Sequence, residues 1–152
     1  MSTLDPVADR RAVIDRRALA DRIATMPPGK RQHAQIARIL AEALAAGRAE
    51  VARRLSSEPG HGRSASRATA FLHDQIVRLA YDFVASDGAG MAIVGLGGTG
   101  RGEMAPYSDL DLMFLTAAKP SAEDERVAQA VLHLLWDLKL KVGHSLRSIN
   151  EL

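Results

Sequence analysis

The chain has 152 residues, of which 47% are hydrophobic and 25% charged, and its formal net charge is +2. This length and composition fit one domain, or a small domain with a helical extension, and exclude a chain that is disordered by composition. The absence of cysteine excludes disulfide bonds and thiolate metal sites.

Location and partner class follow from the same composition. No segment approaches the roughly 18 apolar residues of a membrane-spanning helix, and the N-terminus lacks an apolar signal-peptide region. We therefore expect a cytoplasmic protein without a membrane partner. Basic residues exceed acidic ones before residue 90, but the two signs are interspersed. Because no aromatic residue precedes Phe71, we expect a solvated arginine-rich surface rather than a nucleic-acid interface.

The first half of the chain is predicted to be helical. Apolar residues at helical spacing predict three helices, over about 5–25, 30–55 and 66–85. The first is expected to be a surface helix that ends at Pro27-Pro28-Gly29. The segment 57–66 is the expected linker because it contains a Pro-Gly break. We divide the chain there into an N-terminal helical region, 1–62, and a core, 63–152.

Strands and one further helix are predicted in the second half. Short apolar runs predict three strands, at residues 91–96, 109–115 and 145–149. The first should be buried and should follow a turn at 86–90. Ser121 and Asp124 have the spacing of a capping box, so a helix is expected from there to about Lys141, ended by Gly143. The predicted fold class is α+β, a helical N-terminal region followed by a small mixed sheet.

The segment 93–115, IVGLGGTGRGEMAPYSDLDLMFL, joins two of these strands. Asp109 and Asp111 are two residues apart at the second strand, so their side chains should point to the same face of the sheet. Mg²⁺ prefers one or two carboxylates together with phosphate oxygens and water, so this pair suits a metal-bound triphosphate. Aspartate is unfavourable inside a strand, which also favours a functional role for Asp111.

The glycines of this segment also fit the dinucleotide-binding pattern, with Gly95, Gly97 and Gly100 after a strand. That pattern requires a long helix followed by a parallel strand. Pro106 leaves room for only about one and a half helical turns before the next strand. The dinucleotide interpretation is therefore rejected.

The glycine pair Gly97-Gly98 is instead expected to let the backbone approach a triphosphate closely. Arg101 would then be the nearest cation to the phosphates. An ion pair of Arg101 with Glu103 or Asp109 is the structural alternative for this side chain. We expect Glu103 to have a structural rather than a catalytic role.

The five histidines show no metal-ligand spacing, and no glycine-serine nucleophile elbow accompanies any serine. Each histidine is expected to be at the surface or hydrogen-bonded. These residues are His33, His61, His73, His133 and His144.

Gly97-Gly98, followed after ten residues by Asp109-Leu110-Asp111-Leu112, resembles the pattern of the nucleotidyltransferase superfamily. The string GGTGRGEMAPYSDLDLMFL is most similar to the N-terminal catalytic domain of the bifunctional PII uridylyltransferase/uridylyl-removing enzymes. A tyrosine is common in that family at the position of Thr99. The resemblance covers about 66–152 well and the N-terminal helices loosely.

The resemblance implies a partial polymerase-beta-like core that transfers UMP from UTP to a tyrosyl hydroxyl of the PII nitrogen-regulatory protein. Asp109 and Asp111 would be the catalytic residues and would hold Mg²⁺, or Mn²⁺. Gly97, Gly98 and Arg101 would bind the nucleotide.

Two alternatives stay open. The metal pair does not specify the nucleotide, so a protein adenylyltransferase of the glutamine synthetase-modifying type is one. A non-catalytic regulatory or binding module is the other. The superfamily normally has a third carboxylate on a later strand, and here only Glu151 follows, which we do not assign that role. We therefore expect a fragment or truncated product that is weakly active or inactive alone.

Overall fold

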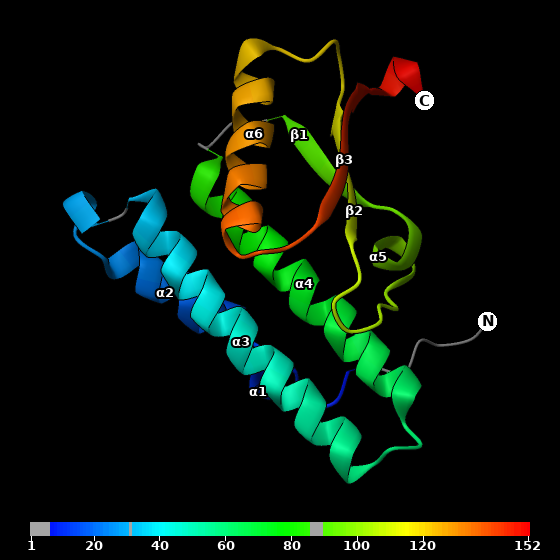
Figure 1. The fold of residues 1–152 in the computed structure, drawn as a ribbon. Helices are drawn as coiled ribbons and strands as arrows, with labels where there is room; N and C mark the ends of the chain where they lie inside the picture. The colour runs from blue at the N-terminus through cyan, green and yellow to red at the C-terminus, as the bar shows by residue number, and fades with distance from the viewer. Residues whose placement is uncertain (1–6, 31, 86–89) are drawn as a thin grey trace.

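The computed structural model describes residues 7–30, 32–85 and 90–152 (Figure 1). The elements, in chain order, are α1 (Arg10–Val13), α2 (Arg16–Thr25), a 3₁₀ turn (Pro28–Lys30), α3 (His33–Ser57), α4 (Gly62–Val84), β1 (Met91–Gly95), α5 (Gly97–Arg101), β2 (Leu110–Thr116), α6 (Ala122–Asp137), β3 (Val142–Ser148) and a second 3₁₀ turn (Ile149–Glu151). Helix α4 runs beneath the sheet and α6, and α3 packs along α4 (Figure 1). The predicted α+β class is confirmed.

The predicted single helix at 5–25 is two helices in the described residues. Ile14 is extended, with φ −161° and ψ 130°, and ends α1. Asp15 then caps α2 by accepting a hydrogen bond from the Ala18 N–H at 3.0 Å. Val13 and Ile14 are buried in the core, so the prediction of a surface helix is wrong for this segment. Residues 5 and 6 lie outside the described residues.

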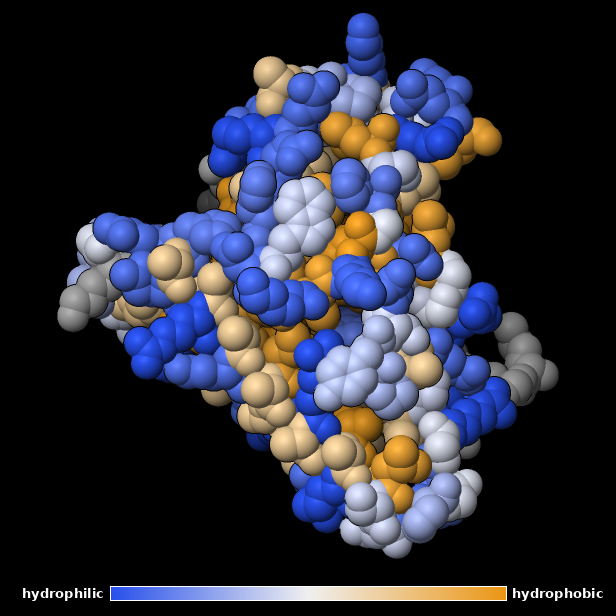
Figure 2. All heavy atoms as spheres, viewed as in Figure 1, coloured by the Kyte–Doolittle hydropathy of each residue, from blue (hydrophilic) through white to orange (hydrophobic). Residues whose placement is uncertain are grey.

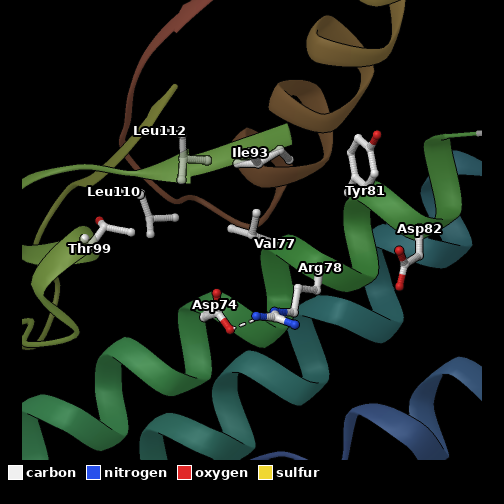
Figure 3. Close-up of a pocket in the computed structure, with 11 residues that line it drawn as sticks. Asp74, Val77, Arg78, Tyr81, Asp82, Ile93, Thr99, Leu110 and Leu112 are labelled. Atoms are coloured by element: carbon white, nitrogen blue, oxygen red, sulfur yellow. Dashed lines mark hydrogen bonds and ion pairs between the residues drawn. The ribbon is translucent and has the colours of Figure 1, made fainter. Parts of the chain in front are cut away.

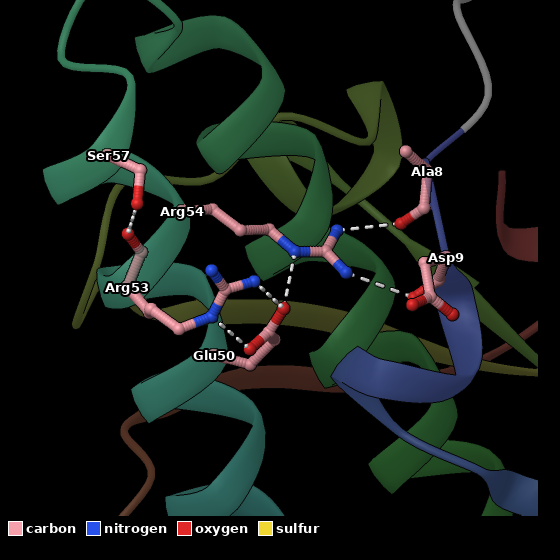
Figure 4. A network of polar contacts seen from close by, with 6 residues as sticks. All are labelled: Ala8, Asp9, Glu50, Arg53, Arg54 and Ser57. Atoms are coloured by element: carbon pink, nitrogen blue, oxygen red, sulfur yellow. Dashed lines mark hydrogen bonds and ion pairs between the residues drawn. The ribbon is translucent and has the colours of Figure 1, made fainter.

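Charged groups fix the N-terminal segment to α3 (Figure 4). Arg54 donates to the carbonyl oxygens of Ala8 and Asp9, at 2.7 and 3.0 Å. Glu50 accepts hydrogen bonds from both Arg53 and Arg54. The hydrogen bond from Arg53, followed by that from Arg54, lowers the pKa of Glu50 to about 2. This carboxylate is therefore ionised and occupied by two guanidinium groups at neutral pH.

Helices α3 and α4 form most of the helical core. Helix α3 buries a stripe that includes Ile36, Leu40 and Leu44. The connection between the helices falls within the predicted linker 57–66 but is shorter, because α3 continues through Ser57 and α4 already begins at Gly62. Only four residues connect the two helices, which therefore pack as an antiparallel pair.

His73 of α4 contradicts the expectation that every histidine is at the surface or hydrogen-bonded. Its side chain has no exposed surface, and neither ring nitrogen has a hydrogen-bond partner within the described part of the chain. Burial, followed by the nearby charge of Arg48, lowers the pKa of His73 to about 4. The imidazole is therefore neutral at pH 7.

The three strands form one mixed sheet in the order β1-β2-β3. Strand β2 pairs antiparallel with β1 and parallel with β3. Because β1 and β2 are antiparallel, the rejection of a dinucleotide-binding crossover is confirmed. Strand β1 is an edge strand in which only Met91 is buried, so the prediction of a buried strand is wrong. Most of the predicted turn at 86–90 lies outside the described residues.

Helix α6 begins at the predicted capping box. Asp124 N–H donates to Ser121 Oγ at 3.1 Å, and Ser121 N–H donates to Asp124 Oδ2 at 2.8 Å. The helix ends at Asp137, earlier than predicted, and Lys139 then adopts a left-handed conformation with φ 62°. Gly143 therefore does not end the helix. It lies inside β3, which begins before the predicted third strand.

Hydrophilic residues cover most of the face shown in Figure 2, and strongly hydrophobic residues reach it in separate patches. A row of weakly hydrophobic residues runs along α3, whose exposed residues include Ala45, Ala46 and Ala49. In the described ranges, no helix is long and apolar enough to cross a bilayer.

Candidate nucleotide and metal site

The glycine pair lies where the chain leaves β1 and enters the short helix α5. Gly97 has φ 53°, a left-handed conformation that glycine adopts without strain. A Cβ atom at Gly98 would lie 2.9 Å from the carbonyl oxygen of Glu103. Any side chain at this position would therefore force the backbone to move. Glu103 N–H donates to Gly98 O at 3.1 Å and closes the turn after α5. Both glycines are therefore required by the backbone of this turn.

Asp111 is an exposed residue of β2 whose carboxylate lies between two glycine backbones. A Cβ atom at Gly97 would lie 3.1 Å from Asp111 Oδ2, and one at Gly143 would lie 2.7 Å from Oδ1. The Asp111 N–H donates to Thr99 Oγ1 at 3.1 Å, and its carbonyl oxygen accepts from Leu96 N–H at 2.9 Å. These two hydrogen bonds fix the backbone of Asp111. Its carboxylate lies in a cradle formed by Gly97 and Gly143, and a side chain at either glycine would crowd it.

Asp109 lies immediately before β2 and is also exposed. Leu110, between the two aspartates, is fully buried, and its N–H donates to Lys141 O at 2.9 Å. This alternation of exposed, buried and exposed residues agrees with the prediction that both carboxylates point to the same face.

Arg101 is exposed at the end of α5, and its Nη2 lies 3.9 Å from the position of a Cβ atom at Gly98. Within the described residues it makes no hydrogen bond or ion pair, so the alternative pairing with Glu103 or Asp109 is not formed. Glu103 instead accepts from Arg63 of α4 at 3.0 Å. That hydrogen bond is the largest cause of a lowered pKa for Glu103. After Arg63, the nearby charge of Arg101 also contributes to the lowered pKa of Glu103, but the Arg101 guanidinium has no hydrogen-bond partner within the described residues that an anionic ligand would have to displace.

Eight curated proteins similar to this chain share one name, bifunctional uridylyltransferase/uridylyl-removing enzyme. The protein from Novosphingobium aromaticivorans is 46% identical over 97% of this chain. Those from Rhodospirillum rubrum and Erythrobacter litoralis are 41% and 37% identical, over 98% and 97% of the chain. The chain is homologous to part of these enzymes. It spans 17% of the length of each of these three bifunctional enzymes. No protein-family model matches the chain.

The name of these relatives says that they are transferases, and the two carboxylates of this chain are groups that can bind a divalent metal. Both are exposed, and Mg²⁺ binds through one or two carboxylates plus phosphate and water oxygens. In residues 7–30, 32–85 and 90–152, no group of three His, Cys, Asp or Glu side chains could hold a metal ion. Glu151 accepts hydrogen bonds from the N–H and the hydroxyl of Ser148, at 2.7 and 2.9 Å. Its carboxylate therefore already has partners within its own turn.

Two residues of the site escaped the sequence analysis. Gly143 forms one wall of the Asp111 cradle through the β2–β3 pairing, and Thr99 accepts the Asp111 N–H. The sequence gives no local signal for Gly143, because its role depends on a contact between distant segments. Thr99 could have been suspected, since its position lies in the glycine turn.

A groove of about 410 Å³ lies between α4 and the sheet (Figure 3). Ile93 and Leu112 line its apolar side, and the ion pair between Asp74 and Arg78, at 2.9 Å, lies on α4 opposite them. Leu112 and Asp111 are neighbours in a strand, so their side chains point to opposite faces. The groove therefore lies on the sheet face opposite the Asp111 carboxylate, and Thr99, which accepts the Asp111 N–H, also lines it.

Proposed function

We propose that this chain carries the nucleotide- and metal-binding part of a site that transfers UMP from UTP to a tyrosyl hydroxyl of the PII nitrogen-regulatory protein. The observation that carries the proposal is the carboxylate of Asp111, held between Gly97 and Gly143 next to the glycine turn. Homology to part of these uridylyltransferases favours UTP as the donor.

In the proposed site, Asp109 and Asp111 would hold Mg²⁺, or Mn²⁺, together with the triphosphate. When bound, the metal supplies positive charge that neutralises the phosphates and lowers the pKa of the attacking hydroxyl. The turn that Gly97 and Gly98 form would bring its backbone close to the phosphate oxygens, and Arg101 would contact a phosphate. The tyrosyl oxygen forms a bond to the α-phosphorus, the bond to pyrophosphate breaks, and the hydroxyl proton passes to solvent.

We propose that this chain alone transfers UMP slowly or not at all. The superfamily pattern has three carboxylates at the metal site, whereas the described residues contain no group of three side chains that could hold a metal ion. We place the reaction in the cytoplasm, since the absence of cysteine is compatible with a reducing compartment.

Calorimetric titration of UTP and of ATP into the chain, each with Mg²⁺, tests the nucleotide and the metal. We expect tighter binding of UTP. Asp109→Asn and Asp111→Asn should each weaken Mg²⁺-dependent binding by more than about tenfold. The matched control is Asp21→Asn, which changes an exposed carboxylate on α2.

Tighter binding of ATP than of UTP would favour protein adenylyl transfer instead. Mg²⁺-dependent binding that survives in both Asp109→Asn and Asp111→Asn would refute the metal assignment. If neither nucleotide binds but PII does, the non-catalytic module is the better description. Rapid transfer of UMP to PII by this chain would refute the expected low activity.

A further inference from the structure

The loop that leads into Asp109 contains a residue in a rarely used conformation. Tyr107 has φ 62°, a left-handed conformation that disfavours bulky side chains and is found at binding and active sites. The strain does not serve to bury the ring, because Tyr107 is 77% exposed. The turn is fixed by a hydrogen bond from Ser108 N–H to Ala105 O at 3.1 Å.

Helices α3 and α4 support the Tyr107 ring and its loop. The guanidinium carbon of Arg48 on α3 lies 4.8 Å from the centre of the Tyr107 ring, within the range of a cation–π interaction. The same loop packs on α4, where Met104 N–H donates to Ser66 O at 3.1 Å (Figure 1). Tyr107 is thus an exposed aromatic residue presented by a rigid support.

A small pocket of about 120 Å³ opens beside this ring. Its walls are mostly apolar and come from α3, α4 and the loop: Val51, Leu55, Leu72 and Pro106. A cavity of about 150 Å³ lined by apolar groups holds a benzene molecule, so this pocket has room for roughly one apolar side chain. We refer to these residues, with Arg48 and Tyr107, as the Tyr107 pocket.

A charged residue at the edge of the Tyr107 pocket limits which ligands can bind there. Arg48 is the one charged residue that lines the pocket, and it makes no ion pair within the described parts of the chain. A matching ligand therefore has an apolar side chain and a carboxylate close together. Tyrosine and arginine are also the residue types that contribute most at protein–protein contacts.

We propose that the Tyr107 pocket docks a segment of the acceptor protein, which inserts one apolar side chain and places a carboxylate beside Arg48. The pocket suits this role because Tyr107 is two residues from Asp109 along the chain, so a bound segment lies next to the proposed metal site. The proposal rests on the proposed function, since transfer to a protein hydroxyl requires a protein substrate at that site.

Binding of PII from Novosphingobium aromaticivorans to the immobilised chain tests the docking. Tyr107→Asn removes the ring but keeps a residue that tolerates the left-handed conformation. It should weaken PII binding at least about fivefold, as should Arg48→Gln. Arg48→Gln should also reduce the dependence of the remaining binding on salt. The controls are Tyr107→Phe, which keeps the ring, and Arg38→Gln, which changes another arginine of α3. Both should bind PII like the wild type.

The UTP titration on the same variants separates this proposal from the reaction. Tyr107→Asn and Arg48→Gln should bind UTP with Mg²⁺ as the wild type does, and circular dichroism checks that they are folded. PII binding that is equal in the wild type and in both variants overturns the docking, and so does a wild type that binds UTP but not PII. If the wild type fails to bind UTP while Tyr107→Asn weakens PII binding, the docking stands and the proposed reaction falls.

Discussion

Protonation of His73 should destabilise the fold as the pH falls below neutrality. The imidazole is fully buried in α4, and neither nitrogen has a partner in the part of the chain that the structure describes. Burial, aided by the charge of Arg48, lowers its pKa from 6.5 to about 4. The perturbation that tests this environment is His73→Leu, which replaces the ring by an apolar side chain of similar size.

The sign and size of the effect follow from the two pKa values. Because the pKa of His73 is lower in the folded protein, the unfolded chain takes up the proton first. The stability that depends on a neutral His73 is therefore fully present above pH 6.5, and it is lost as the pH falls towards 4. At about 1.4 kcal/mol per pH unit, the whole interval corresponds to about 3 kcal/mol, of which about 2 kcal/mol is lost by pH 5. Small domains have a total stability of only about 5–15 kcal/mol.

Urea unfolding of the wild type and of His73→Leu at pH 7, 6 and 5 measures this loss. At pH 7 the variant should be at least as stable, because it buries no unpaired ring nitrogen. By pH 5 the difference should grow by about 2 kcal/mol in favour of the variant. Carboxylates such as Glu103 are present in both proteins, so their contributions to the pH dependence cancel in the difference between the two. The control His61→Gln changes an exposed histidine and should follow the wild type. Parallel pH profiles for the wild type and His73→Leu would refute the reasoning.

Three further substitutions test the site and its support. Gly143→Ala places a Cβ atom 2.7 Å from Asp111 Oδ1 and should weaken Mg²⁺-dependent UTP binding roughly tenfold in calorimetry. Unchanged affinity would contradict the cradle. Thr99→Val removes the acceptor of the Asp111 N–H. It should lower the free energy of unfolding in urea by about 1 kcal/mol and should also weaken UTP binding. Ser121→Ala removes half of the α6 capping box and should also cost about 1 kcal/mol. Its UTP binding should equal that of the wild type, and a loss there would contradict the separation of cap and site.

Elements that depend on neighbouring residues could be predicted from the sequence. The start of α6 follows from Ser121 and Asp124, because both hydrogen bonds of a capping box lie within one helical turn. The short helix after Gly97 follows from Pro106, which limits the length of any helix in that loop. The antiparallel pairing of β1 with β2 then follows, since so short a connection cannot make a parallel crossover.

The burial of His73 could not be predicted in this way. Sequence periodicity assigns one apolar stripe to a helix, and that stripe in α4 includes Leu72, Ile76 and Leu79. Helix α4, however, contacts α1, α2, α3, α5 and α6, so residues outside the stripe are buried as well. How many sides of a helix are covered depends on the tertiary arrangement.

The same limit applies to the site, where the sequence treats the two aspartates as equivalent and the structure does not. Thr99 holds the backbone of Asp111, and the Asp111 carboxylate lies between Gly97 and Gly143, which limits the positions that it can take. Asp109 precedes the strand, without a comparable cradle among the described residues. Preorganised ligands bind a metal at a lower entropic cost. Asp111 should therefore fix the position of the metal, and Asp109 should complete the coordination once the nucleotide is bound.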